Sequence, residues 1–181
     1  MDRIGFACLF YALMGGVGLL LMVWRIGGDA TLEATLRWPT PWGGPFLIVL
    51  LGIVVTHGLS RWLSEKIAMV RRSAWEIRRY LGELNPKQIL WLALFSGFGE
   101  ELFFRGWLLP ETGLFFSSLI FGLIHVPLNR DWMLWPVFAF LMGLLLGWLT
   151  LWSGHLLWPI LLHAGINYWN LRYFLRPIPT V

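Results

Sequence analysis

The stretch GEELFFRGW, residues 99–107, places two adjacent glutamates and one arginine inside a long apolar segment. A helix of a soluble protein would carry such charges on its solvated face. This chain offers little solvated surface, because 57% of its 181 residues are hydrophobic and only 13% are charged. Such a composition is typical of an integral membrane protein, so we expect the three charges to lie within the bilayer.

A helix that crosses a bilayer needs about 20 apolar residues. The sequence contains six apolar segments that approach or exceed this length: residues 4–24, 38–60, 88–109, 113–127, 132–152 and 155–174. Pro110 and Gly113 mark a tight connection between the third and the fourth. Cys8 is the single cysteine, so no internal disulfide is possible. We predict an all-α fold, in which residues 1–181 form one integral membrane domain, a polytopic bundle of about six transmembrane helices.

Basic residues predict the orientation of this bundle. Seven lysines and arginines lie between the second and third segments, in residues 61–87. Short loops of this kind stay in the cytoplasm, so we expect both termini there too, in a multi-pass protein of the bacterial inner (plasma) membrane. Apolar residues recur at helical spacing over residues 67–81, which predicts an amphipathic cytoplasmic helix on the inner leaflet. The topology explains the net charge of +4, and we expect no nucleic-acid partner.

The charges in the third segment indicate a function, because a charged side chain at mid-bilayer costs about 2.5–3.5 kcal/mol. Glu101 and Arg105 are four residues apart, so they can pair on one face of a helix. Glu100 lies about 100° around the helix from Glu101 and is not consumed by that pair. It therefore needs a partner from another helix.

Three polar residues of other segments lie at a comparable predicted depth. His125 ends the fourth segment, and His163 and Asn167 lie four residues apart in the sixth, on one helical face. A lone histidine in a membrane is often only a hydrogen-bonding group between helices. A carboxylate, two imidazoles and an amide at one depth instead favour a single polar pocket.

The same residues form three ordered motifs. EELFFRG, FGLIH and HAGIN follow the patterns EExxxR, FxxxH and HxxxN, within residues 88–170. This trio resembles the CAAX-protease and bacteriocin-processing (CPBP) family of intramembrane proteases, which is related to the Rce1-type prenyl protease. The resemblance implies that residues 88–170 form a catalytic core and that the substrate is a membrane-anchored protein or peptide in the lipid bilayer.

The resemblance also implies a role for each polar residue. Glu100 would activate the attacking water and His125 would help to hold that water. His163 and Asn167 would form the oxyanion hole, while Glu101 and Arg105 would brace the site. These roles agree with general chemistry, since a buried carboxylate is a stronger base than an exposed one and amide or imidazole donors stabilise a developing oxyanion.

The sequence leaves alternatives open for both the mechanism and the function. Glu100, His125 and His163 can supply the three ligands of a catalytic zinc, although the absence of an HExxH motif favours a glutamic-type mechanism without a cofactor. Buried carboxylates and histidines also build ion relays, so a proton- or ion-coupled transporter is one alternative function. A non-catalytic immunity or binding protein on the same scaffold is the other.

Overall fold

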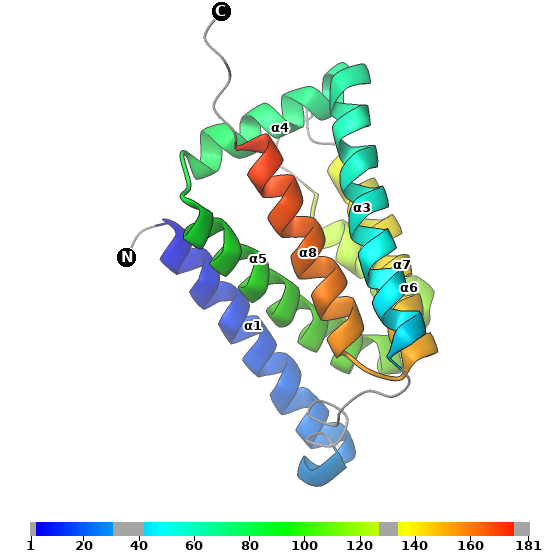
Figure 1. Ribbon diagram of the computed structural model, residues 1–181. Helices are drawn as coiled ribbons and strands as arrows, with labels where there is room; N and C mark the ends of the chain where they lie inside the picture. Colours follow the sequence, from blue (N-terminus) through cyan, green and yellow to red (C-terminus); the bar gives the residue numbers. More distant parts are fainter. Residues whose placement is uncertain (1–2, 31–41, 127–133, 176–181) are drawn as a thin grey trace, which may run out of the picture.

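The computed structural model describes residues 3–30, 42–126 and 134–175, and within these ranges it contains helices and no strand (Figure 1). The elements are α1 (Arg3–Ile26), α3 (Gly43–Lys66), α4 (Ala68–Leu81), α5 (Pro86–Glu101), the π-helical segment η1 (Leu102–Leu108), α6 (Leu109–Ile124), α7 (Leu134–Ser153) and α8 (Leu157–Phe174). The predicted all-α bundle is confirmed.

Four stretches of the described residues are long and apolar enough to cross a membrane: Arg3–Ile26, Gly43–Lys66, Pro86–Ile124 and Leu134–Ser153. The third of them contains two of the predicted spans, which meet at Gly113, where φ is 78° and ψ is 171°. Glycine adopts this left-handed conformation without a steric penalty, so the chain turns there. The last predicted span corresponds to α8, which carries the polar residues of the third motif. The predicted starts at residues 38 and 132 lie outside the described residues.

The amphipathic helix predicted over residues 67–81 is present as α4, which crosses one end of the bundle in Figure 1. It contacts α3 and α8. The guanidinium Nη1 of Arg3 donates a hydrogen bond to the Tyr80 carbonyl at 2.7 Å, which joins the start of α1 to the end of α4. The predicted topology requires these segments to share one side of the membrane. That this side is the cytoplasmic one stays a prediction.

Helix α5 begins with a complete capping arrangement. The side chain of Asn85 accepts a hydrogen bond from the backbone N–H of Gln88 at 2.9 Å, and the Gln88 side chain accepts one from the Asn85 N–H at 3.0 Å. Pro86 occupies the first turn, where its missing N–H costs nothing. The helix therefore starts at Pro86, two residues before the predicted start of the span at residue 88.

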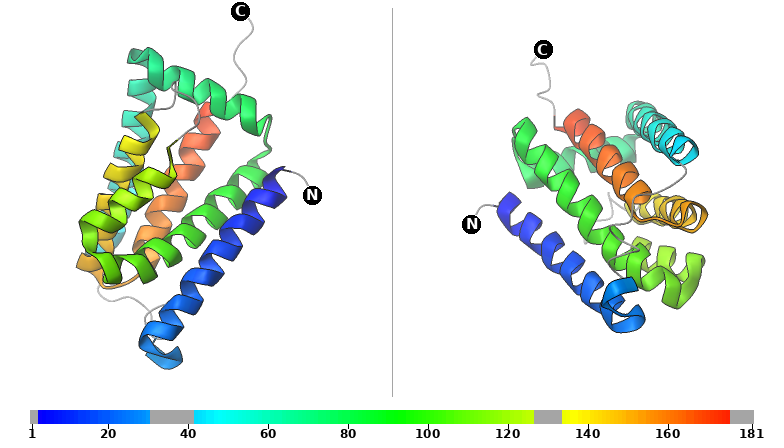
Figure 2. Two further views of the ribbon diagram at one scale, coloured as in Figure 1. Left: turned by 180° about the vertical axis from the view of Figure 1, so that it is seen from behind. Right: turned by 60° about the horizontal axis from the view of Figure 1, so that its bottom comes forward.

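Glycines let α5 approach its neighbours closely. A Cβ on Gly99 would overlap the carbonyl of Tyr11 in α1, and a Cβ on Gly97 would lie 2.9 Å from the backbone nitrogen of Ala164 in α8. Small residues at such contacts are the usual means of packing helices in membranes. Helix α5 consequently lies against α1 on one side (Figure 2) and against α8 on the other, and it carries both motif glutamates between them.

Candidate active site

The first motif lies where the helix changes from α to π geometry. α5 ends at Glu101, and residues 102–108 continue as η1, which contains Arg105. Arg105 Nη1 donates to Glu101 Oε1 at 2.9 Å, and its Nη2 donates to the Gly143 carbonyl of α7 at 3.2 Å. Glu101 is 0% and Arg105 is 3% exposed. The predicted pair is thus formed and fully buried, and it also holds α7 against η1. π-helical turns often mark functional sites.

His163 lies between the two glutamates. Its Nδ1 is 2.7 Å from Glu101 Oε1, and its Nε2 is 3.8 Å from Glu100 Oε2. A carboxylate only accepts hydrogen bonds, so Nδ1 carries the proton toward Glu101. In the neutral ring Nε2 is then an acceptor, and in the protonated ring both nitrogens are donors. The imidazole therefore couples the buried Glu101–Arg105 pair to Glu100.

His125 is held by its own helix end. It follows the last residue of α6, and its Nδ1 donates to the Phe121 carbonyl at 2.6 Å, which leaves Nε2 as the acceptor of the neutral ring. The Phe121 ring contacts several site groups at once. Its centroid lies 4.7 Å from that of His125, 6.1 Å from that of His163 and 4.5 Å from the guanidinium carbon of Arg105.

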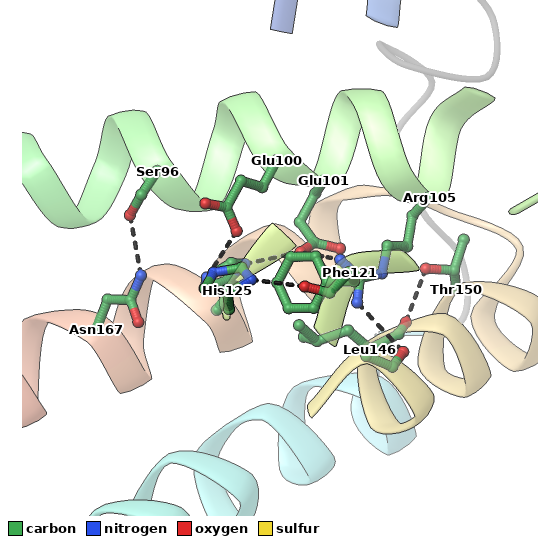
Figure 3. Close-up of polar contacts among 11 residues, drawn as sticks. Ser96, Glu100, Glu101, Arg105, Phe121, His125, Leu146, Thr150 and Asn167 are labelled. Carbon is green, nitrogen blue, oxygen red and sulfur yellow. Dashed lines mark hydrogen bonds and ion pairs between the residues drawn. The ribbon is translucent and has the colours of Figure 1, made fainter. Parts of the chain in front are cut away.

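Asn167 lies beside the second half of α5. Its Nδ2 donates to Ser96 Oγ at 2.9 Å, as Figure 3 shows. The Ser96 hydroxyl in turn donates to the Ala93 carbonyl at 3.2 Å. An amide nitrogen carries two hydrogens, so one donor of Asn167 is used by Ser96 and a second remains.

The four residues predicted to act together line one cavity of about 190 Å³. Glu100, His125, His163 and Asn167 come from α5, the end of α6 and α8, and they meet there. Glu100 is 4% exposed, and its Oε2 has no hydrogen-bond partner. The remaining wall is formed by Tyr11, Phe121, Trp135, Phe138, Ala139, Met142, Leu146 and Ile166. The cavity combines a free carboxylate oxygen, two imidazoles and an amide within mainly apolar walls, which suits proton transfer to and from a bound molecule.

Sequence reasoning missed several residues that shape the site. Phe121 belongs to the second motif, and its spacing of four from His125 was the available signal. Ser96, Gly143 and Tyr11 have no such signal, because each meets the site through a contact between helices that are distant in sequence.

In the part of the chain that the structure describes, no three His, Cys, Asp or Glu side chains are grouped so that they could hold a metal ion. Glu100, His125 and His163 share the cavity, and Nδ1 of each histidine is engaged, by the Phe121 carbonyl and Glu101 respectively, so Nε2 is the nitrogen that each ring presents for other interactions.

These features define a class of protein: a helical membrane protein with a buried glutamate, histidine and asparagine site. Residues 83–169 match the model of the family described as type II CAAX prenyl endopeptidase Rce1-like, so this segment of the chain is similar to that family. The match includes all three motifs.

The chain is also similar to a curated protein. The chain is 36% identical over 90 residues to the uncharacterized protein YpbD of Bacillus subtilis (strain 168), and the match covers 50% of this chain and 47% of the relative. The chain thus matches about half the length of that relative. No solved structure shows a significant match.

Proposed function

We propose that the protein is an intramembrane endopeptidase that hydrolyses a peptide bond of a membrane-anchored protein or peptide. The observation that carries this proposal is the buried Glu100 carboxylate, whose Oε2 has no hydrogen-bond partner and which shares a cavity with His125, His163 and Asn167. A buried carboxylate oxygen without a hydrogen bond lowers stability. Its place in the Rce1-like segment supports a catalytic reason for retaining it.

In the proposed reaction Glu100 acts as the general base. A water held between Glu100 and the free Nε2 of His125 loses a proton to the Glu100 carboxylate as its oxygen attacks the substrate carbonyl. The tetrahedral intermediate then collapses, the C–N bond breaks, and the proton held by Glu100 passes to the leaving nitrogen. Hydrolysis is complete without any other reactant.

The oxyanion of the intermediate needs donors on the opposite side. Asn167 can supply the amide hydrogen that Ser96 does not use, and His163 can donate from Nε2 when it is protonated. Each such donor is worth about 3 kcal/mol in comparable enzymes. Glu101 orients the His163 ring, because its Oε1 lies 2.7 Å from Nδ1.

Glu101 and Arg105 do not line the cavity. Their proposed role is structural, because Glu101 holds His163, which does line it. We propose that this reaction is glutamic-type and needs no metal. Hydrolysis should then be unchanged after dialysis against a strong chelator, whereas activity that is lost on dialysis and restored by added zinc would contradict this part of the mechanism.

The test of the whole proposal is a cleavage assay on protein reconstituted in lipid nanodiscs, with membrane peptides as substrates and mass spectrometry of the products. Glu100→Gln should lower turnover about 10²- to 10⁴-fold, because it removes the general base and leaves the size of the side chain unchanged. Glu111→Gln is the matched control. Glu111 is partly exposed and pairs with Arg25 at 3.3 Å, away from the cavity.

Three results would separate the competing functions. Full turnover by Glu100→Gln would remove this mechanism. Folded wild-type protein that binds peptides without cutting them would favour a binding protein, and proton uptake into vesicles without cleavage would favour a transporter.

A further inference from the structure

Tyr11 of α1 lies outside residues 83–169, which match the family, and outside the three motifs. Tyr11 and Glu100 nevertheless line the same cavity, and the phenol lies close enough to the carboxylate for the two groups to interact. The contact joins the N-terminal helix to the residue on which the proposed chemistry depends.

Backbone packing holds Tyr11 and Glu100 in register. Gly99, which directly precedes Glu100, lies against the Tyr11 carbonyl so closely that a Cβ would overlap it. One turn further along α1, a Cβ on Gly15 would lie 3.0 Å from the Gly99 Cα. The relative position of the two helices is therefore set by main-chain atoms, which move less easily than side chains.

The other groups around Glu100 have partners of their own. Arg105 and His163 Nδ1 both bond to Glu101, and His125 Nδ1 bonds to the Phe121 carbonyl. His163 Nε2 is 3.8 Å from Glu100, beyond hydrogen-bonding distance. The Tyr11 phenol is a hydroxyl donor that shares the cavity with Glu100, whose carboxylate can only accept when it is charged.

Tyr11 also lines a second cavity, which is partly formed by residues of α4. This neighbouring cavity, of about 260 Å³, is also lined by Trp135, Phe138 and Asn167, which line the catalytic cavity as well. Removing only its hydroxyl leaves the ring in place as a wall of both cavities. A change from tyrosine to phenylalanine therefore separates the effect of the hydroxyl on Glu100 from the shape of the site.

We propose that Tyr11 is a positioning residue of the active site, which orients the Glu100 carboxylate toward the water that it activates. α1 would then complete a site whose other polar residues all come from the family segment. This inference rests on the proposed function, because positioning a base matters only if Glu100 acts as one.

The test compares Tyr11→Phe with Tyr168→Phe. The Tyr168 hydroxyl accepts a hydrogen bond from Arg172 at 3.0 Å at the exposed end of α8, so it is a matched control away from the cavity. Tyr11→Phe should lower kcat about ten- to hundredfold and leave KM unchanged, which is the range expected for losing a hydrogen bond to a charged group. In the Glu100→Gln background it should cause no further loss, since it acts through Glu100.

Infrared spectroscopy tests the contact separately from turnover. The carboxyl band that disappears in Glu100→Gln should shift in Tyr11→Phe and stay in place in Tyr168→Phe. Wild-type kcat in Tyr11→Phe, a change in KM alone, or an unshifted band would overturn the inference. A folded wild type that cuts no substrate would instead reject the proposed function, so the two failures are distinguishable.

Discussion

Replacing Arg105 with methionine should strongly destabilise the protein, because it leaves the Glu101 carboxylate buried without its counter-charge. The guanidinium donates to Glu101 at 2.9 Å and to the Gly143 carbonyl at 3.2 Å, and it lies over the Phe121 ring at 4.5 Å. Methionine retains the apolar stem and loses all three interactions. Removing one partner of a buried ion pair costs about 3–5 kcal/mol. We expect the upper part of this range, since Glu101 is 0% exposed and water cannot reach it.

The double variant Glu101→Gln/Arg105→Met separates the unpaired charge from lost packing. It removes both charges, and its glutamine oxygen can still accept from His163 Nδ1. Its loss of stability should be smaller than the sum of the two single losses by about 1–3 kcal/mol. The assay is reversible unfolding in mixed micelles of increasing SDS content, followed by tryptophan fluorescence. An Arg105→Met variant within about 0.5 kcal/mol of the wild type, or losses that simply add, would refute the reasoning.

Two further predictions concern packing and topology. Gly99→Ala should destabilise the bundle by about 1–3 kcal/mol, because the new methyl group meets the backbone of α1. Gly16→Ala is the control, since its Cβ would have no neighbour within 4 Å. Equal stability of the two variants would contradict the packing. The topology can be tested with single cysteines in a Cys8→Ser background. A cysteine that replaces Arg79, whose side chain is 82% exposed on α4, should react with an impermeant reagent only from the cytoplasm, and one that replaces Asp29 only from outside. Labelling of position 79 from outside would contradict the predicted orientation.

Contacts within one helix were predictable from the sequence. Glu101 and Arg105 pair across four residues as their spacing indicates, although the helix between them has π geometry. His163 and Asn167 share a face of α8 and line one cavity, again as a spacing of four requires. The apolar composition likewise predicted helices, because a chain in hydrocarbon must satisfy its backbone hydrogen bonds internally.

The sequence by itself determined the helices, the turn at Gly113 and the identity of the polar residues that share a helix face, because each depends on local spacing or composition. Only the tertiary structure decided that His163 lies between both glutamates, that Arg105 reaches the Gly143 carbonyl and that Tyr11 contacts Glu100. These contacts join residues 38 to 89 positions apart. They depend on how closely two helices approach. For the contacts of α5 with α1 and α8, that distance is set by the absence of a side chain at Gly99 and Gly97, which no spacing pattern records.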